Sequence, residues 1–239
     1  MKLNIVIVGA GGVGGRLLSE VARYCQYQPT LETQILLIDG DCYEVKNADR
    51  QAFSCMGKKA EVKVSECAGL FNRVSLTPVS EFLTPDNIDV LIDDSDGVND
   101  LTIVFVCVDN HKTRRLIDEY AGKMQNVVVI NGGNNLIDGN VQMCVRKDGK
   151  WLTATMSEIH DEVANPQDKS PHELHCEELA AVSEPQLPFA NLMVTALMCT
   201  ALYNVVQNLG SLDRLVEIGE AFFDMTQMSV VPYPRPVSD

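Results

Sequence analysis

Basic residues are scarce in this chain of 239 residues. Lys and Arg number 19 against 33 Asp and Glu, and the net charge is −14. Because this excess of negative charge repels polyanions, we expect neither nucleic acid nor an anionic membrane surface as the main partner. No uninterrupted apolar run of about 18 residues occurs, so no membrane span is expected. The apolar N-terminus leads directly into a glycine-rich loop, so we expect no signal peptide and a soluble, cytoplasmic protein.

Paired cysteine motifs are also missing. The eight cysteines never occur at CxxC spacing, which argues against a structural zinc site built from such pairs. A chain of this length, with 46% hydrophobic residues, can form its own core and needs no disulfide framework. We therefore expect reduced thiols in one large α/β domain.

The N-terminal segment predicts a site for a nucleotide phosphate. An apolar run from Ile5 to Val8 is typical of a buried parallel strand. Gly9, Gly11 and Gly14 follow at GxGxxG spacing, and apolar residues at positions 17–22 continue at helical spacing. Glycines let the backbone approach a phosphate closely, and the first free N–H groups of the helix supply an anion site.

A second apolar run, from Ile35 to Ile38, ends at Asp39. A carboxylate at the carboxyl edge of a parallel sheet can accept hydrogen bonds from ribose hydroxyls, so the ligand is expected to be a nucleotide. Taken alone, the glycines and this acid favour a nicotinamide or flavin cofactor.

The residues after Asp39 change that prediction. The chain continues as DGDCYEVKNADRQ, then as GKKAEV, and later as FVCVDNHKTRR. These pieces resemble, in the same order, motifs of the family that includes ThiF, MoeB and the ubiquitin-activating enzymes. The resemblance runs from about residue 5 to about residue 139, and more loosely to residue 208. The matching residues are Asp39, Asp41, Val45 (shifted by one position), Asn47, Arg50, Gln51, Lys59, Ala60 and Asp109, the last followed by Arg114.

The resemblance implies an adenylyltransferase that uses ATP and magnesium. In this family a carboxylate, usually the C-terminal glycine of a ubiquitin-like or sulfur-carrier protein, attacks the α-phosphate, and pyrophosphate leaves. Positive groups and a metal must neutralise the charge that builds at phosphorus. Arg50 and Lys59 are the candidate cations, and Asp109 is the candidate magnesium ligand. Asn47 and Gln51 are expected to position the nucleotide, and a homodimer is expected by the same resemblance.

Three of these assignments have alternatives. The spacing from Gly57 to Lys59 is one residue shorter than the family pattern, so Lys58 and Lys63 remain candidates. Asp109 has an alternative role as the cap of a helix that begins near His111, since Asp is a favoured N-cap residue. The alternative for Arg50 is an ion pair on the surface.

Cys176 is the candidate for passing the acyl group onward. Family members that do so use a cysteine in the second half of the chain, and here Gln186 and Asn191 follow it in the family's pattern. The neighbouring Glu177 and Glu178 are expected to raise the pKa of the thiol, which disfavours a reactive thiolate. A plain thiol is therefore the alternative. A non-standard metal site is another, with the ligands His160, His172, His175 and Cys176.

Alternating strands and helices predict a Rossmann-like α/β fold. We expect a mainly parallel sheet with helices on both faces and antiparallel strands in the C-terminal half. The single domain, 1–239, would comprise a nucleotide-binding half, 1–135, and a half for carrier binding and possible dimerisation, 136–239. The latter includes a predicted mobile crossover loop at 158–188 and an apolar helix at 190–209.

Two departures from the family pattern leave other functions open. Many members begin with a helix whose arginine reaches the partner subunit's ATP, whereas the first predicted strand here begins at about Leu3. This departure and the irregular lysine spacing favour the alternative of a non-catalytic, nucleotide-binding partner subunit. An NAD-dependent oxidoreductase is a further alternative, although Arg50, Gln51 and Asp109 have no evident use in it.

Overall fold

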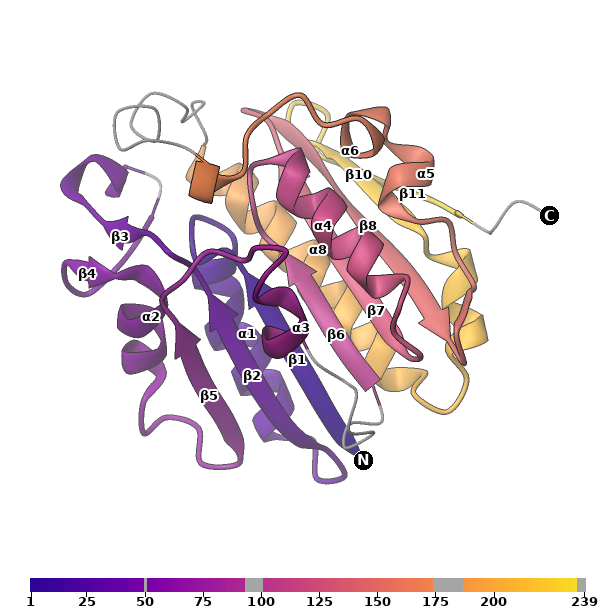
Figure 1. Cartoon of the computed structure of the whole chain (residues 1–239), viewed down its shortest axis with the longest axis horizontal. Helices are drawn as coiled ribbons and strands as arrows, with labels where there is room; N and C mark the ends of the chain where they lie inside the picture. The colour runs from indigo at the N-terminus through magenta and orange to yellow at the C-terminus, as the bar shows by residue number, and fades with distance from the viewer. Residues whose placement is uncertain (50, 93–100, 174–186, 236–239) are drawn as a thin grey trace.

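The computed structural model describes residues 1–49, 51–92, 101–173 and 187–235. Its centre is a nine-stranded sheet in the order β11, β10, β8, β7, β6, β1, β2, β5, with β9 paired to β8 (Figure 1). The strands are β1 (Lys2–Val8), β2 (Glu32–Ile38), β5 (Val74–Val79), β6 (Leu101–Val106), β7 (Val127–Asn134), β8 (Asp138–Lys147), β9 (Lys150–Trp151), β10 (Glu220–Asp224) and β11 (Ser229–Tyr233). The neighbouring strands β5, β2, β1, β6 and β7 pair in parallel. The pairs β7–β8, β8–β9, β8–β10 and β10–β11 are antiparallel. The predicted sheet is confirmed.

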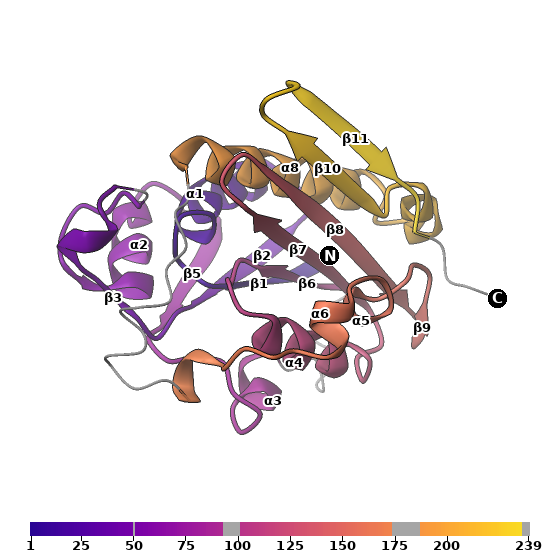
Figure 2. The same cartoon turned by 90° about the horizontal axis from the view of Figure 1, so that it is seen from above.

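Helices cover both faces of this sheet (Figures 1 and 2). One face packs against α1 (Gly14–Gln26), α2 (Lys59–Cys67) and α8 (Pro188–Gln207). The other packs against α3 (Ile88–Leu91), α4 (His111–Ala121), α5 (Met156–Ile159) and α6 (Asp161–Ala164). Side chains of β1 alternate between the two layers, with Ile5 and Ile7 in the first core and Val6 and Val8 in the second. Burial on both faces explains why this strand is an unbroken apolar run.

One face of helix α8 belongs to the core. Its residues Val194, Met198 and Leu202 are fully buried, and Val194 packs so closely on β7 that a Cβ on Gly132 would lie 2.6 Å from its Cγ1. Within the described residues it is the one helix long and apolar enough to cross a membrane, and 44% of its apolar window is buried in the protein.

Several element boundaries differ from the predictions. The segment predicted as a crossover loop, 158–188, contains the end of α5, helix α6 and the short 3-10 helix η2 (Pro171–Glu173), while 174–186 lie outside the described residues. Strands β8 and β9 form a hairpin around Lys147 and Lys150, and its second strand is only two residues long. Strand β11 forms the edge of the sheet beside β10.

The parallel register places the candidate site at one edge of the sheet. Val8 of β1 lies opposite Ile38 of β2 and Val106 of β6. Gly9 and Asp39 therefore leave their strands at the same edge. From β1 the chain first adds strands on one side of the sheet, beginning with β2, and later adds strands on the other side, beginning with β6. Ligands of such sheets bind at the carboxyl ends of the strands beside this switch point.

Candidate active site

The glycine-rich loop joins β1 to α1 through a turn that requires glycine. Gly9 has a φ of 96°, and a Cβ on it would lie 2.6 Å from the carbonyl oxygen of Cys107. A Cβ on Gly14 would overlap the carbonyl oxygen of Gly9. Helix α1 begins at Gly14 with no capping side chain and no acidic residue in its first turn. The N–H groups of Gly15 and Arg16 donate to the carbonyl oxygens of Gly11 and Val13. The helix dipole and the remaining N–H groups of the loop and the helix start therefore suit a phosphate.

Asp39 joins the glycine loop to the loop that follows β2. One of its carboxylate oxygens accepts the N–H of Ala10 at 2.6 Å, and the other accepts the N–H of Asp41 at 2.8 Å. Burial raises the pKa of Asp39, although Lys59 and the two backbone N–H groups act in the opposite direction. The carboxylate predicted to bind ribose thus also shapes the phosphate loop.

Lys59 lies beside these carboxylates. Its side chain is 8% exposed, and its Nζ lies 2.9 Å from Oδ2 of Asp41. The short strands β3 (Cys42–Tyr43) and β4 (Gly57–Lys58) pair here, and the N–H of Lys59 donates to the carbonyl oxygen of Asp41 at 2.9 Å. The chain is therefore fixed so that the first residue of α2 points into the site.

The two alternative lysines lie elsewhere. Lys58 is exposed, and its Nζ donates to the carbonyl oxygen of Gly40 at 3.4 Å. Lys63 pairs with Glu66 at 2.6 Å and lies over the ring of Phe53. Of the three lysines, Lys59 is the one that the structure brings to the carboxylates at the end of β2.

Asn47 and Gln51 lie in the turn between β3 and β4. Asn47 is buried, and its Oδ1 accepts the N–H of Glu44 at 3.0 Å, so its amide stabilises the turn. The Gln51 side chain lies against the loop: its Nε2 is 3.5 Å from the position of a Cβ on Gly11, and its buried Oε1 has no partner among the described residues. Arg50, the other predicted cation, lies outside the described residues.

Asp109 is exposed at the carboxyl end of β6. It does not cap α4, because the N-cap is Asn110, whose Oδ1 accepts the N–H of Thr113 at 2.8 Å. The described residues contain no group of three or more His, Cys, Asp or Glu side chains that could hold a metal. Magnesium commonly needs only one or two protein carboxylates besides phosphate and water, so Asp109 suits that ion, whereas a zinc-type cage has no support in this part of the chain.

Asp168 is a residue that the sequence did not suggest. Its carboxylate accepts the N–H groups of His111 and Lys112, the latter at 3.1 Å, at the N-terminus of α4. A negative charge there is stabilised by the helix dipole. Asp168 therefore helps to fix the start of the helix directly after Asp109.

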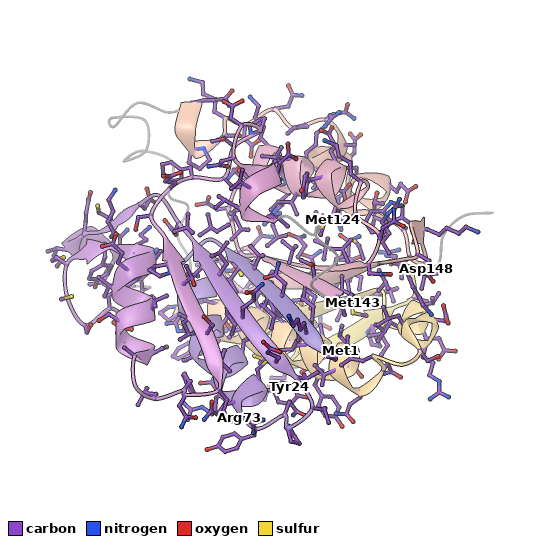
Figure 3. All side chains as sticks on the ribbon, turned by 60° about the horizontal axis from the view of Figure 1, so that its bottom comes forward. Met1, Tyr24, Arg73, Met124, Met143 and Asp148 are labelled. Atoms are coloured by element: carbon purple, nitrogen blue, oxygen red, sulfur yellow. The ribbon has the colours of Figure 1, made fainter. Side chains whose placement is uncertain are left out.

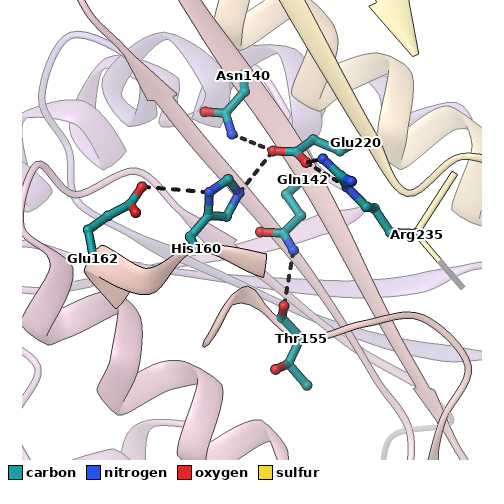
Figure 4. A network of polar contacts seen from close by, with 7 residues as sticks. All are labelled: Asn140, Gln142, Thr155, His160, Glu162, Glu220 and Arg235. Atoms are coloured by element: carbon teal, nitrogen blue, oxygen red, sulfur yellow. Dashed lines mark hydrogen bonds and ion pairs between the residues drawn. The ribbon is translucent and has the colours of Figure 1, made fainter. Parts of the chain in front are cut away.

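A polar network on β8 and β10 was also not predicted (Figure 4). Glu220 is buried, and its carboxylate accepts hydrogen bonds from Asn140 at 2.6 Å and from Arg235 at 2.9 and 2.7 Å, while its Oε1 lies 2.9 Å from Nε2 of His160. His160 was considered as a metal ligand, but here it contacts Glu220. The side chain of His172 and residues His175, Cys176 and Gln186 lie outside the described part of the chain.

The opposite edge of the sheet has a cavity but none of these groups. The cavity, about 340 Å³ in volume, lies at the amino ends of β1 and β6, and its lining includes Met1, Leu101 and Asp148. Figure 3 labels Met1 and Asp148 among these residues. It is separated from the glycine loop by the length of the strands. The candidate site is therefore confined to the carboxyl edge.

Solved structures with a similar fold include MccB from E. coli and PaaA. MccB crystallised with MccA-N7isoASN is 18% identical, with a TM-score of 0.67, and the match covers 98% of this chain and 64% of that one. MccB with ATP is 18% identical, with a TM-score of 0.65 and the same coverage. PaaA is 15% identical, with a TM-score of 0.63, and the match covers 98% and 64%. The chain thus spans less than two thirds of the length of these neighbours, 64% in each case.

One of two sequence comparisons identifies the family. No match was found among the curated proteins. The sequence model of the ThiF family matches residues 1–236, which includes the glycine loop, Asp39, Lys59 and Asp109. The chain belongs to the ThiF family.

Proposed function

We propose that this chain adenylates a carboxylate. ATP would bind with its phosphates at the glycine loop, a carboxylate oxygen would form a bond to the α-phosphorus, and the bond to the β-phosphate oxygen would break, so that pyrophosphate leaves. The observation that carries the proposal is the position of Lys59, a nearly buried ammonium fixed beside Asp39 and Asp41 next to the loop. MccB, which has a similar fold, was crystallised with ATP.

Each described residue of the site has a proposed role in this reaction. The N–H groups at the start of α1 would hold a phosphate, and Asp39 would keep the loop in place while its remaining lone pairs accept a ribose hydroxyl. Lys59 would leave Asp41 for the phosphate oxygens, where an ammonium acts as a mobile point charge. Asp109 would hold magnesium, which neutralises charge on the triphosphate when it is bound. Arg50 would add a second cation, on the basis of the family motif alone.

The acyl substrate is proposed to be the C-terminus of a small protein or peptide. The family resemblance favours a ubiquitin-like or sulfur-carrier protein. MccB, which has a similar fold, was crystallised with MccA. This supports a peptide or small protein as the acyl substrate of this chain. Transfer to Cys176 would be a later step, which adenylation does not require.

We also propose that a second copy of the chain packs on α8. This helix has no charged residue in 20 positions. Phe189, Leu192 and Tyr203 recur at helical spacing on its outer face and are 65%, 48% and 52% exposed. Two copies with a charge of −14 each repel less where their contact surfaces are neutral. Sedimentation of wild type and Leu192→Glu tests the dimer, which the added charge should dissociate.

ATP–pyrophosphate exchange tests the proposed reaction. The full chain is incubated with ATP, magnesium, labelled pyrophosphate and candidate ubiquitin-like proteins, each also supplied with an amidated C-terminus as a matched control. Exchange should depend on the free carboxylate and on magnesium. A chain that binds no ATP would refute the proposal, and ATP binding without exchange would support the non-catalytic partner instead.

A further inference from the structure

Arg114 lies above the carboxyl ends of β6 and β7. It belongs to the first turn of α4, and its Nη2 donates to the carbonyl oxygen of Val108 at 2.9 Å and to that of Gly132 at 3.4 Å. Its buried Nε has no acceptor in the part of the chain that the structure describes. Two backbone carbonyls therefore hold the guanidinium in place, and some of its five N–H groups remain available.

The guanidinium also lacks a close counter-ion. No described carboxylate lies within 4.0 Å of Arg114, whereas the next residue of α4, Arg115, pairs with Glu119. Among the described arginines, Arg114 is the one with a buried side-chain nitrogen that has no acceptor. Burial lowers the pKa of Arg114, and the more distant Asp109 acts in the opposite direction. A partly desolvated cation without a close counter-ion is costly in a folded protein, so an anion that reaches it would be bound favourably.

The position of Arg114 suggests which anion this is. The glycine loop follows β1, Asp109 follows β6, and Arg114 spans the ends of β6 and β7, so Asp109 lies between the phosphate loop and the guanidinium. Lys59 and Asp39 are on the other side of β1. The triphosphate is thus expected at the glycine loop, between Lys59 and Asp109, and the group that attacks it is expected to arrive from the β7 side.

Gly133 lets the guanidinium lie close to the strand. A Cβ at this position would be 3.1 Å from Nη2 and 3.5 Å from Nη1 of Arg114, so a side chain would displace the guanidinium by a few tenths of an ångström. Asn140, which pairs with Gly133 across the sheet, has its Oδ1 3.5 Å from the same point. The guanidinium therefore lies on a flat, polar part of the sheet.

We propose that Arg114 binds the carboxylate of the acyl substrate and directs it toward the α-phosphate; this inference rests on the proposed adenylation. A guanidinium can donate two parallel hydrogen bonds to a carboxylate, which fixes the orientation of the attacking oxygen. The carboxylate loses its charge as the bond to phosphorus forms. Arg114 therefore contributes mainly to binding of the acyl substrate, so its loss should raise KM more than it lowers kcat.

The test compares Arg114→Gln with Arg115→Gln in ATP–pyrophosphate exchange, using the carrier protein on which the wild type is active. Arg115 is the matched control, because it is the next residue of α4 and its Nε pairs with Glu119 at 2.7 Å. Arg114→Gln should raise the KM for the carrier about 10- to 100-fold, the range expected for hydrogen bonds to a charged group, and should leave the KM for ATP nearly unchanged. Arg114→Lys should be intermediate.

A purely structural role is distinguished by chemical rescue. Guanidinium ions added to Arg114→Ala should restore binding of the carrier, which a misfolded site would not allow. If Arg114 variants unfold, Gly133→Ala keeps the charge and displaces the guanidinium, and its KM for the carrier should rise by a smaller factor. An unchanged KM in a folded variant, or an equal rise in the KM for ATP, would overturn the inference. Absence of exchange in the wild type with every carrier would instead refute the proposed function.

Discussion

Replacing Glu220 with Gln should destabilise the whole C-terminal half of the sheet. Glu220 is 1% exposed, and its carboxylate joins Asn140 of β8, His160 between α5 and α6, and Arg235 after β11 (Figure 4). A Cβ on Gly219 would overlap the backbone of Arg235, so the tail is packed tightly against β10. The substitution keeps the shape of the side chain but removes the charge that these donors share.

The magnitude follows from burial. Removing one partner of a buried ion pair costs about 3–5 kcal/mol. The side chain of Arg235 is 31% exposed, so water can solvate part of the charge that remains, and we expect a loss of about 2–4 kcal/mol in the free energy of unfolding. For a chain of this size this corresponds to a decrease of roughly 4–16 °C in Tm.

The pH dependence has a defined sign. Burial alone would raise the pKa of Glu220, but hydrogen bonds from His160, Asn140 and Arg235 outweigh it and hold the pKa below the ordinary value of 4.5. A carboxyl group whose pKa is lower in the folded state stabilises the fold above its unfolded value and loses this contribution as the pH falls through the folded value. The difference between wild type and Glu220→Gln should thus be full at pH 7 and shrink below pH 4.5.

Urea unfolding, followed by circular dichroism at pH 7, 5, 4 and 3, measures this difference. Glu217→Gln is the matched control, because Glu217 is exposed and lies three residues earlier, and it should change stability little. Equal stability of Glu220→Gln and wild type at pH 7, or a difference that stays constant down to pH 3, would refute the reasoning.

Three further changes test the site. Lys59→Ala should lower kcat/KM for exchange by about 10²–10³-fold, whereas exposed Lys58→Ala should change it by no more than about twofold. Asp39→Asn places an amide where two backbone N–H groups need acceptors. Thermal melts should therefore show a loss of about 1–3 kcal/mol in the free energy of unfolding, and titration with ATP should show a weaker affinity. Asp168→Asn should cost about 0.5–1 kcal/mol through the dipole of α4, and this loss should shrink at high salt in the same melts.

The parts of the site that are local in sequence could be predicted. An apolar run followed by glycines at fixed spacing predicts a strand, a loop and a helix. Parallel pairing of two such runs then implies that Gly9 and Asp39 lie at one edge. The hydrogen bond from Ala10 to Asp39 follows from this geometry.

The choice between lysines needed three-dimensional information. Lys58, Lys59 and Lys63 are close together in sequence, and their spacing fits the family pattern imperfectly. The pairing of β3 with β4 and the start of α2 at Lys59 decide which side chain is buried beside Asp41. No local sequence pattern predicts the pairing of β3 with β4.

Contacts over long distances in sequence were not predictable. Asp168 reaches the N-terminus of α4 from 57 residues away, and Glu220 meets His160 from 60 residues away. An acidic residue at the start of an apolar strand is a weak signal of a buried carboxylate, and it does not identify the partners. The partners of such residues can be identified only from the folded structure.

The charges at the site favour a nucleotide that carries a metal ion. Three acids, Asp39, Asp41 and Asp109, lie at this edge with two described cations, Lys59 and Arg114, so this part of the site would repel a bare triphosphate. Asp39 already accepts two backbone N–H groups, and Asp41 pairs with Lys59. Asp109 is the acid of the three that is exposed and has no partner among the described residues, so its lone pairs are available to a cation. Because magnesium would both bind Asp109 and neutralise the phosphates, we predict that ATP binds here as its magnesium complex rather than as the free anion.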